Sequence, residues 1–207
     1  IEQLLAGLGQ HAQTATITNP GTGKPSHLLP IFTRAEVLAS AENARAEMSN
    51  WAKTPVRDRA EVLLHLHDLM LENQTRLLDL LQFETGKSRG SAFEDFAGAL
   101  SSARHYGKIA PKLLGLHRVR SGAPTMVSNF VDYPPIGLVG VITPWNYPLA
   151  LTGLDVLPAL VAGNSVLHKI DNQTALTALY LRRLAMEAGL PESAWTIVVG
   201  DGAEVGN

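Results

Sequence analysis

The 207-residue sequence predicts an α/β protein in which N-terminal helices precede part of a parallel sheet. Three short apolar runs, at 136–142, 165–169 and 195–199, have the length and composition of buried strands. Helical patterns at 149–161 and 174–188 separate these runs. Strand, helix and parallel strand form the repeating unit of doubly wound sheets, so the alternation predicts a parallel sheet covered by helices.

Residues 1–32 carry residues that interrupt regular structure. These are Pro20, Gly21, Gly23, Pro25 and Pro30. Because proline and glycine mark turns and loops, we expect an irregular N-terminal arm over 1–32.

A helical region is predicted over 33–117. Thr33 and Glu36 have the spacing of a capping box, in which a hydroxyl and a carboxylate satisfy unpaired backbone amides. A helical stripe of apolar residues follows, made of Val37, Ala41, Ala44, Met48 and Trp51. A second helix is expected to start at Pro55 and end near Gly86, and an alanine-rich helix fits 88–106.

Residues 118–134 place apolar side chains among polar ones around Gly122 and Pro124, which predicts a β-hairpin arm. Residues 135–207 then read as the first half of a Rossmann-like nucleotide-binding domain. A parallel sheet of three strands would leave an unpaired edge and half of a ligand crevice. We therefore expect this chain to be a truncated part of a longer protein.

Composition and charge exclude several classes of protein. The net charge of −2 gives no electrostatic footprint for nucleic acid, and the apolar runs are shorter than the roughly 20 residues of a membrane-spanning helix. The chain contains no cysteine, which excludes disulfides and thiolate metal sites, and no metal site is predicted. A cytoplasmic location is the default expectation.

Lys169 ends the second predicted strand, at the edge where such sheets bind ligands. An ammonium there can donate to ribose hydroxyls or pair with a 2′-phosphate, although many strand-end lysines only reach solvent. Gly200, Gly202 and Gly206 follow the third strand. Glycines in that place either let a phosphate approach the backbone or form a tight turn. Asn146, after the first strand, is either a turn residue or a side-chain hydrogen-bond donor.

Two motifs together resemble the nicotinamide-binding half of the aldehyde dehydrogenase superfamily. They are Val141-Ile142-Thr143-Pro144-Trp145-Asn146-Tyr147-Pro148 and Pro158-Ala159-Leu160-Val161-Ala162-Gly163-Asn164-Ser165-Val166-Leu167-His168-Lys169. Glu84-Thr85-Gly86-Lys87 is similar to a motif that ends an N-terminal helix in this superfamily, with a structural role. The resemblance is best with the succinate-semialdehyde dehydrogenases. It implies an aldehyde dehydrogenase-like fold.

The resemblance also implies an activity, the NAD(P)-dependent oxidation of an aldehyde to a carboxylic acid. In the family a cysteine adds to the aldehyde, hydride passes to nicotinamide, and a glutamate-activated water hydrolyses the thioester. Since this chain has no cysteine, the nucleophile is expected beyond residue 207 and the chain alone is expected to be inactive. The 118–134 arm is expected to join subunits of a homodimer or homotetramer.

The resemblance assigns roles to particular residues. Asn146 would donate to the oxyanion that forms on the aldehyde, and Lys169 would bind the ribose or the 2′-phosphate. The remaining cofactor contacts are expected at Ile142, Thr143, Pro144, Trp145, Asn172, Gln173, Gly202 and Gly206. Many members place a glutamate against the ribose hydroxyls where this chain has Asn172. A neutral amide does not repel a 2′-phosphate, so the sequence favours NADP, with NAD as the alternative.

Two other functions stay open from the sequence. One is a naturally short, non-catalytic protein that binds nucleotide or a partner, which the exposed sheet edge disfavours. The other is reduction of an acyl-CoA or acyl phosphate on the same scaffold. The residues around the nucleophile would distinguish these chemistries.

Overall fold

The structure is a computed structural model that describes residues 1–123 and 125–205, apart from the side chain of Glu47. Its centre is a parallel sheet in the order β5-β6-β7. The strands are β5 (Leu138–Ile142), β6 (Ser165–Lys169) and β7 (Trp195–Val198). The predicted α/β fold with a parallel sheet is confirmed.

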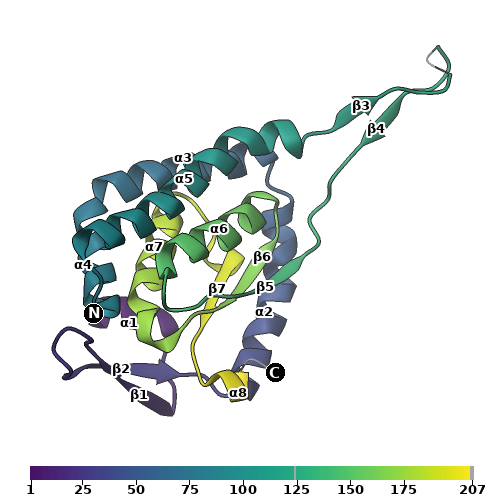
Figure 1. Cartoon of the computed structure of the whole chain (residues 1–207). Coiled ribbons are helices and arrows are strands. Elements are labelled where there is room, and N and C mark those ends of the chain that lie inside the picture. The colour runs from purple at the N-terminus through teal and green to yellow at the C-terminus, as the bar shows by residue number, and fades with distance from the viewer. Residues whose placement is uncertain (124, 206–207) are drawn as a thin grey trace.

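Helices cover both faces of this sheet (Figure 1). Helix α2 (Arg34–Ala52) packs on one face, and the crossover helices α6 (Pro148–Val161) and α7 (Ala175–Glu187) lie on the other. Both crossovers run in the same direction, and right-handed connections then place their helices on the same side. The largest fully buried side chains are Trp195, Phe96, Leu29, Leu63, Leu66, Met70, Leu77, Leu81, Leu149, Leu157, Leu160 and Ile170.

A further helical layer packs on α6 and α7. It consists of α3 (Val56–Glu72), α4 (Gln74–Thr85) and α5 (Arg89–Leu113). Helices α5 and α6 approach closely because Gly98 and Gly153 lack side chains. A Cβ on Gly153 would lie 2.7 Å from the Cα of Ala99. Helix α6 is therefore held firmly against α5.

The helix boundaries follow the sequence signals in part. The predicted capping box starts α2, with Thr33 N donating to Glu36 Oε2 at 2.7 Å and Glu36 N donating to Thr33 Oγ1 at 3.4 Å.

The prediction of a single helix from Pro55 to Gly86 was wrong, because α3 and α4 are separate helices. At the break, Asn73 Nδ2 donates to Leu69 O at 2.9 Å, and Asn73 Oδ1 accepts from Tyr180 at 2.6 Å. The side chain of Asn73 thus competes with the helical backbone and is held by a distant helix.

The third helix, α5, was predicted to end at 106 but continues to Leu113. Gly107 does not stop it, since this glycine allows Leu64 of α3 to pack against the α5 backbone. A Cβ at Gly107 would lie 2.9 Å from the Leu64 side chain. Helix packing therefore extends α5 past a residue of low helix propensity.

Residues 1–32 are more regular than predicted. After α1 (Glu2–Leu5) and a short 3-10 turn, β1 (Gln13–Thr18) and β2 (Pro25–Ile31) pair as an antiparallel hairpin. The prolines and glycines that suggested an irregular arm mostly lie in its turn. Inward-facing Ile17 and Leu29 join the core. The alternation of β-branched residues in 13–18 was the signal that the prediction missed.

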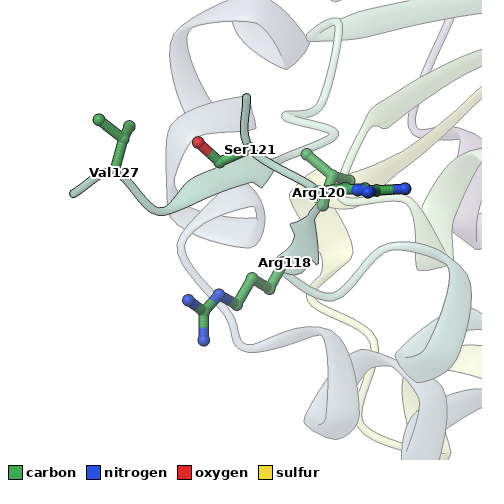
Figure 2. Close-up of a pocket in the computed structure, with 5 residues that line it drawn as sticks. Arg118, Arg120, Ser121 and Val127 are labelled. Atoms are coloured by element: carbon green, nitrogen blue, oxygen red, sulfur yellow. The ribbon is translucent and has the colours of Figure 1, made fainter. Parts of the chain in front are cut away.

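A second hairpin, β3 (His117–Val119) and β4 (Asn129–Val131), projects from the body at the place predicted for the arm (Figure 1). A hollow of about 290 Å³ lies along it, and Figure 2 shows the Arg118 and Arg120 side chains pointing to different sides there. Apolar Met126 is 85% exposed and Phe130 is 54% exposed. Such exposed apolar side chains are typical of surfaces that a partner covers.

Strand β5 was expected to be buried, but it lies at one side of the described sheet. Ile142 is 68% exposed. Within residues 1–123 and 125–205, β5 pairs only with β6, and this single pairing explains the exposure. The same part of the chain holds no helix with the length and apolar character needed to cross a membrane.

Candidate functional site

The carboxyl ends of the three parallel strands lie at one edge of the sheet. Their registers align Ile142 with Lys169 and Lys169 with Val198. Two backbone hydrogen bonds continue the alignment, from Thr143 N to Lys169 O at 3.1 Å and from Ile170 N to Val198 O at 3.2 Å. Open α/β sheets bind their ligands at this edge, so the candidate site begins here.

A pocket of about 420 Å³ opens beside Lys169. The structure brings five of the residues singled out in the sequence together in its lining: Lys169, Asn172, Gln173, Gly200 and Gly202. They come from the turns that follow β6 and β7, which the parallel sheet places side by side. Gly206, also predicted here, lies outside the described residues.

Sequence reasoning missed part of the lining. Asp171, Asp201 and residues 15–17 of β1 also border the pocket. The β1 contribution depends on a contact between distant segments, which no local pattern indicates. The two carboxylates could have been noticed, because each lies next to a predicted residue. They place negative charge near the Lys169 ammonium.

The amide side chains of the β6 turn connect the walls of the pocket. Asn172 Oδ1 accepts a hydrogen bond from Gly200 N at 2.9 Å, which links the turns after β6 and β7. Gln173 Nε2 donates to Thr18 O and to Glu84 O, both at 3.0 Å. Gln173 thereby fixes the N-terminal hairpin and the end of α4 against the pocket.

The loop after β5 carries the second group of predicted residues. Trp145 is 59% exposed, and Pro144 and Asn146 are exposed as well. Thr143 differs, because it is buried and its Oγ1 lies 2.8 Å from His168 Nε2. The Asn146 side chain is thus presented at the sheet edge on a loop anchored at Thr143.

Glu84 is a buried carboxylate that the site depends on indirectly. Its oxygens accept hydrogen bonds from Leu176 N at 2.6 Å, Thr177 N at 2.8 Å and Thr177 Oγ1 at 2.5 Å. Burial raises the pKa of Glu84 to about 7, while the hydrogen bonds from Thr177 and Leu176 act to lower it. The carboxylate caps the N-terminus of α7, immediately after the turn that carries Asn172.

The model of the aldehyde dehydrogenase family matches residues 8–207. The chain belongs to the aldehyde dehydrogenase family. This confirms the resemblance carried by the motifs around Asn146 and Lys169.

Curated relatives of this aldehyde dehydrogenase chain are considerably longer than it is. One, from Mycobacterium ulcerans, is named "Putative succinate-semialdehyde dehydrogenase (NADP(+)) 2" and is 44% identical over 193 residues, which are 93% of this chain and 37% of the relative. Another, from Picrophilus torridus, is named D-glyceraldehyde dehydrogenase (NADP(+)) and is 31% identical over 91% of this chain and 38% of its own length. The chain thus spans less than two fifths of these relatives.

Solved structures of aldehyde dehydrogenases share its fold. An NAD-dependent benzaldehyde dehydrogenase from Corynebacterium glutamicum matches with a TM-score of 0.85 and 29% identity, over 96% of this chain and 43% of that one. Betaine aldehyde dehydrogenase from Staphylococcus aureus, solved in complex with NAD+, matches with a TM-score of 0.87 and 25% identity, over 95% and 40%.

His168 of this aldehyde dehydrogenase chain is a neutral core residue beside the site. It is fully buried on β6, and burial, followed by the charge of Lys169, lowers its pKa to about 3. Its Nε2 faces the Thr143 hydroxyl. The imidazole therefore supports the loop after β5 as a neutral hydrogen-bonding group.

The pKa of His168 predicts a loss of stability in mild acid. The folded-state value lies below the unfolded value of 6.5, so the unfolded chain takes up the proton first as the pH falls. Between pH 7.5 and pH 5 this residue should remove about 2 kcal/mol from the free energy of unfolding. His168→Gln should lose that part of the pH dependence in denaturant titrations, and His105→Gln, on the exposed face of α5, should keep it. Equal pH dependence in all three proteins would contradict the assignment.

Proposed function

We propose that the whole protein, of which this chain forms part, is an aldehyde dehydrogenase that oxidises succinate semialdehyde with NADP+ as the preferred cofactor. The pocket beside Lys169 is the observation that carries the proposal. It lies at the ligand-binding edge of the sheet and presents an ammonium and a neutral amide. The name of the M. ulcerans relative supports the substrate and the cofactor.

The pocket suits the adenosine end of a nicotinamide dinucleotide. When bound, such a cofactor supplies the acceptor for hydride from the substrate. Lys169 would donate to ribose hydroxyls or to a 2′-phosphate, and Asn172, with its Oδ1 engaged by Gly200, would turn its NH₂ group to the ligand. Asp171 and Asp201 oppose part of the positive charge, so we expect a moderate rather than an absolute preference for NADP+.

Asn146 would act on the substrate. When a nucleophile adds to an aldehyde, negative charge develops on the carbonyl oxygen, and the Asn146 NH₂ group would donate a hydrogen bond to it. The nucleophile and the base that activates water would come from the remainder of the protein, because this chain has no cysteine.

The β3–β4 arm, with its exposed Met126 and Phe130, would join subunits of a homodimer or homotetramer. We also propose a cytoplasmic location, the default expectation from the sequence.

The proposal is tested by measuring NADP+ and NAD+ reduction by the natural full-length product with a series of aldehydes. We expect succinate semialdehyde to give the highest kcat/KM, with NADP+ favoured over NAD+. A product that binds nucleotide but oxidises no aldehyde would contradict the proposal. Reduction of an acyl-CoA or acyl phosphate instead would assign the scaffold to that chemistry.

Cofactor preference should depend on Asn172. In Asn172→Glu the new carboxylate would repel a 2′-phosphate and would accept from ribose hydroxyls. The ratio of kcat/KM for NADP+ to that for NAD+ should fall roughly 10- to 100-fold, as expected for about 1.4–3 kcal/mol of repulsion. Gln10→Glu, at an exposed position outside the pocket, controls for net charge. An unchanged ratio would exclude Asn172 as a determinant of cofactor preference.

A further inference from the structure

A buried ion pair connects the start of α5 to the loop that carries Asn146. Lys87 Nζ lies 2.9 Å from Asp95 Oδ2 and donates to the backbone oxygen of Asn146 at 2.8 Å. Nζ also lies 4.4 Å from the centroid of the Tyr147 ring, within the range of a cation–π contact. The Asp95 side chain is fully buried, and the Lys87 side chain is only 13% exposed. Lys87 thus contacts both Asn146 and the residue that follows it.

The second oxygen of Asp95 holds the other end of the same loop. Asp95 Oδ1 accepts from Ala150 N at 2.6 Å. Ala150 lies in the first turn of α6, where backbone amides lack partners within the helix, so Asp95 caps α6 from outside. Gly98, one turn further along α5, packs directly against Ala150. Lys87, just before α5, and Asp95, within α5, therefore fix the loop between β5 and α6 at both of its ends.

Stability alone is a weak reason for a charged pair in this place. Removing two charges from water is costly, and buried ion pairs can often be replaced by uncharged residues without loss of stability. The contacts of Lys87 indicate another role for the pair, which is to restrict the conformation of the loop at Asn146. A cation bound to the Asn146 carbonyl restricts rotation of the peptide between Asn146 and Tyr147, and so holds in place the backbone from which the Asn146 side chain projects.

We propose that Lys87 and Asp95 are positioning residues that hold the Asn146 side chain in its orientation toward the oxyanion. The inference rests on the proposed function, in which Asn146 donates to that oxyanion. It gives a role to the lysine of the Glu84-Thr85-Gly86-Lys87 motif. Gly86, which has a φ of +70°, turns the chain between Glu84 and Lys87. Glu84 then caps α7 on the cofactor side, while Lys87 holds the loop on the substrate side.

The test uses the full-length enzyme with both charges removed together. In Lys87→Met with Asp95→Asn, the asparagine oxygen can still accept from Ala150 N, so the cap of α6 is retained while the cation on Asn146 is lost. We expect kcat to fall roughly 10- to 100-fold, the loss typical of a misplaced catalytic group. The Kd for NADP+ should stay within about twofold, since the Lys169 pocket is intact. Lys112→Met removes an exposed lysine near the end of α5, the helix that carries Asp95, and is the matched control.

An epistasis measurement separates positioning from general structural damage. If the pair acts through the Asn146 side chain, the double substitution should lower kcat by no more than about twofold in an Asn146→Ala background. The full loss of activity in that background would overturn the proposal, because the pair would then act independently of Asn146.

A second readout does not depend on activity. Hydrogen exchange at the backbone amides of residues 145–147 should accelerate in the double variant and stay unchanged in Lys112→Met. Unchanged exchange would overturn the inference whether or not the enzyme is active. If the wild-type protein oxidises no aldehyde while exchange still accelerates, the proposed function fails but the anchoring of the loop stands.

Discussion

Replacing Glu84 with glutamine is expected to lower the free energy of unfolding by about 3 kcal/mol, although the two side chains have nearly the same shape. The two Glu84 oxygens accept from two successive backbone amides, those of Leu176 and Thr177. Glutamine has one oxygen, so its NH₂ group must face one of these amides. A buried donor then lies against a donor, and one N–H group at the start of α7 stays unsatisfied.

Thermal unfolding of the chain at pH 5.5, below the pKa of Glu84, measures this effect without the cost of burying a charge, because both oxygens of the neutral carboxyl group can still accept hydrogen bonds. A loss of about 3 kcal/mol corresponds to a decrease in Tm of roughly 6–12 °C for a chain of this size. Glu72→Gln, at an exposed position at the end of α3, is the control and should leave the Tm unchanged. If both variants unfold at the same temperature, the cap on α7 contributes little.

The same substitution should affect cofactor binding. Helix α7 begins directly after the 3-10 turn Asn172–Thr174, which carries two residues of the pocket lining. Gln173 also donates to the backbone oxygen of Glu84. Disturbing Glu84 should therefore weaken NADP+ binding without any direct contact to the cofactor.

Local sequence signals predicted the elements whose determinants lie within a few residues. The hydroxyl of Thr33 and the carboxylate of Glu36 specify the start of α2 wherever that helix packs. Gly86 adopts the left-handed conformation that ends α4, as its position predicted. The three strands and two crossover helices followed from apolar patterning, which reports burial on one or both faces directly.

Distant contacts decided the features that were missed. The break between α3 and α4 is stabilised by Tyr180, which is far from Asn73 in sequence. Strand β1 borders the Lys169 pocket only because the hairpin is bound through Gln173. The partners of Lys87 lie on two separate elements, α5 and the loop after β5. Sequence patterns report the immediate neighbours of a residue and its burial, but not which distant groups the fold brings to it.

Asn146→Ala is expected to lower kcat of the full-length enzyme roughly 100- to 1,000-fold, equivalent to about 2.7–4 kcal/mol of transition-state stabilisation. The large effect is expected because the side-chain NH₂ group would interact with charge that exists only after the nucleophile has added. Substrate and cofactor binding precede this step. The Kd for NADP+ should therefore hardly change, and single-turnover measurements should place the defect before or at hydride transfer.

A second variant distinguishes loss of the donor from loss of volume. Asn146→Asp keeps the shape of the side chain but replaces the NH₂ group with an oxygen, which repels an oxyanion instead of stabilising it. Its kcat should be as low as that of Asn146→Ala or lower, even though the packing around Tyr147 is retained. Near-normal activity in Asn146→Asp would show that Asn146 only shapes the loop, and the anchoring by Lys87 would then serve the backbone rather than a catalytic donor. An Asn146→Asp defect with unchanged cofactor affinity would instead assign the hydrogen bond to the transition state.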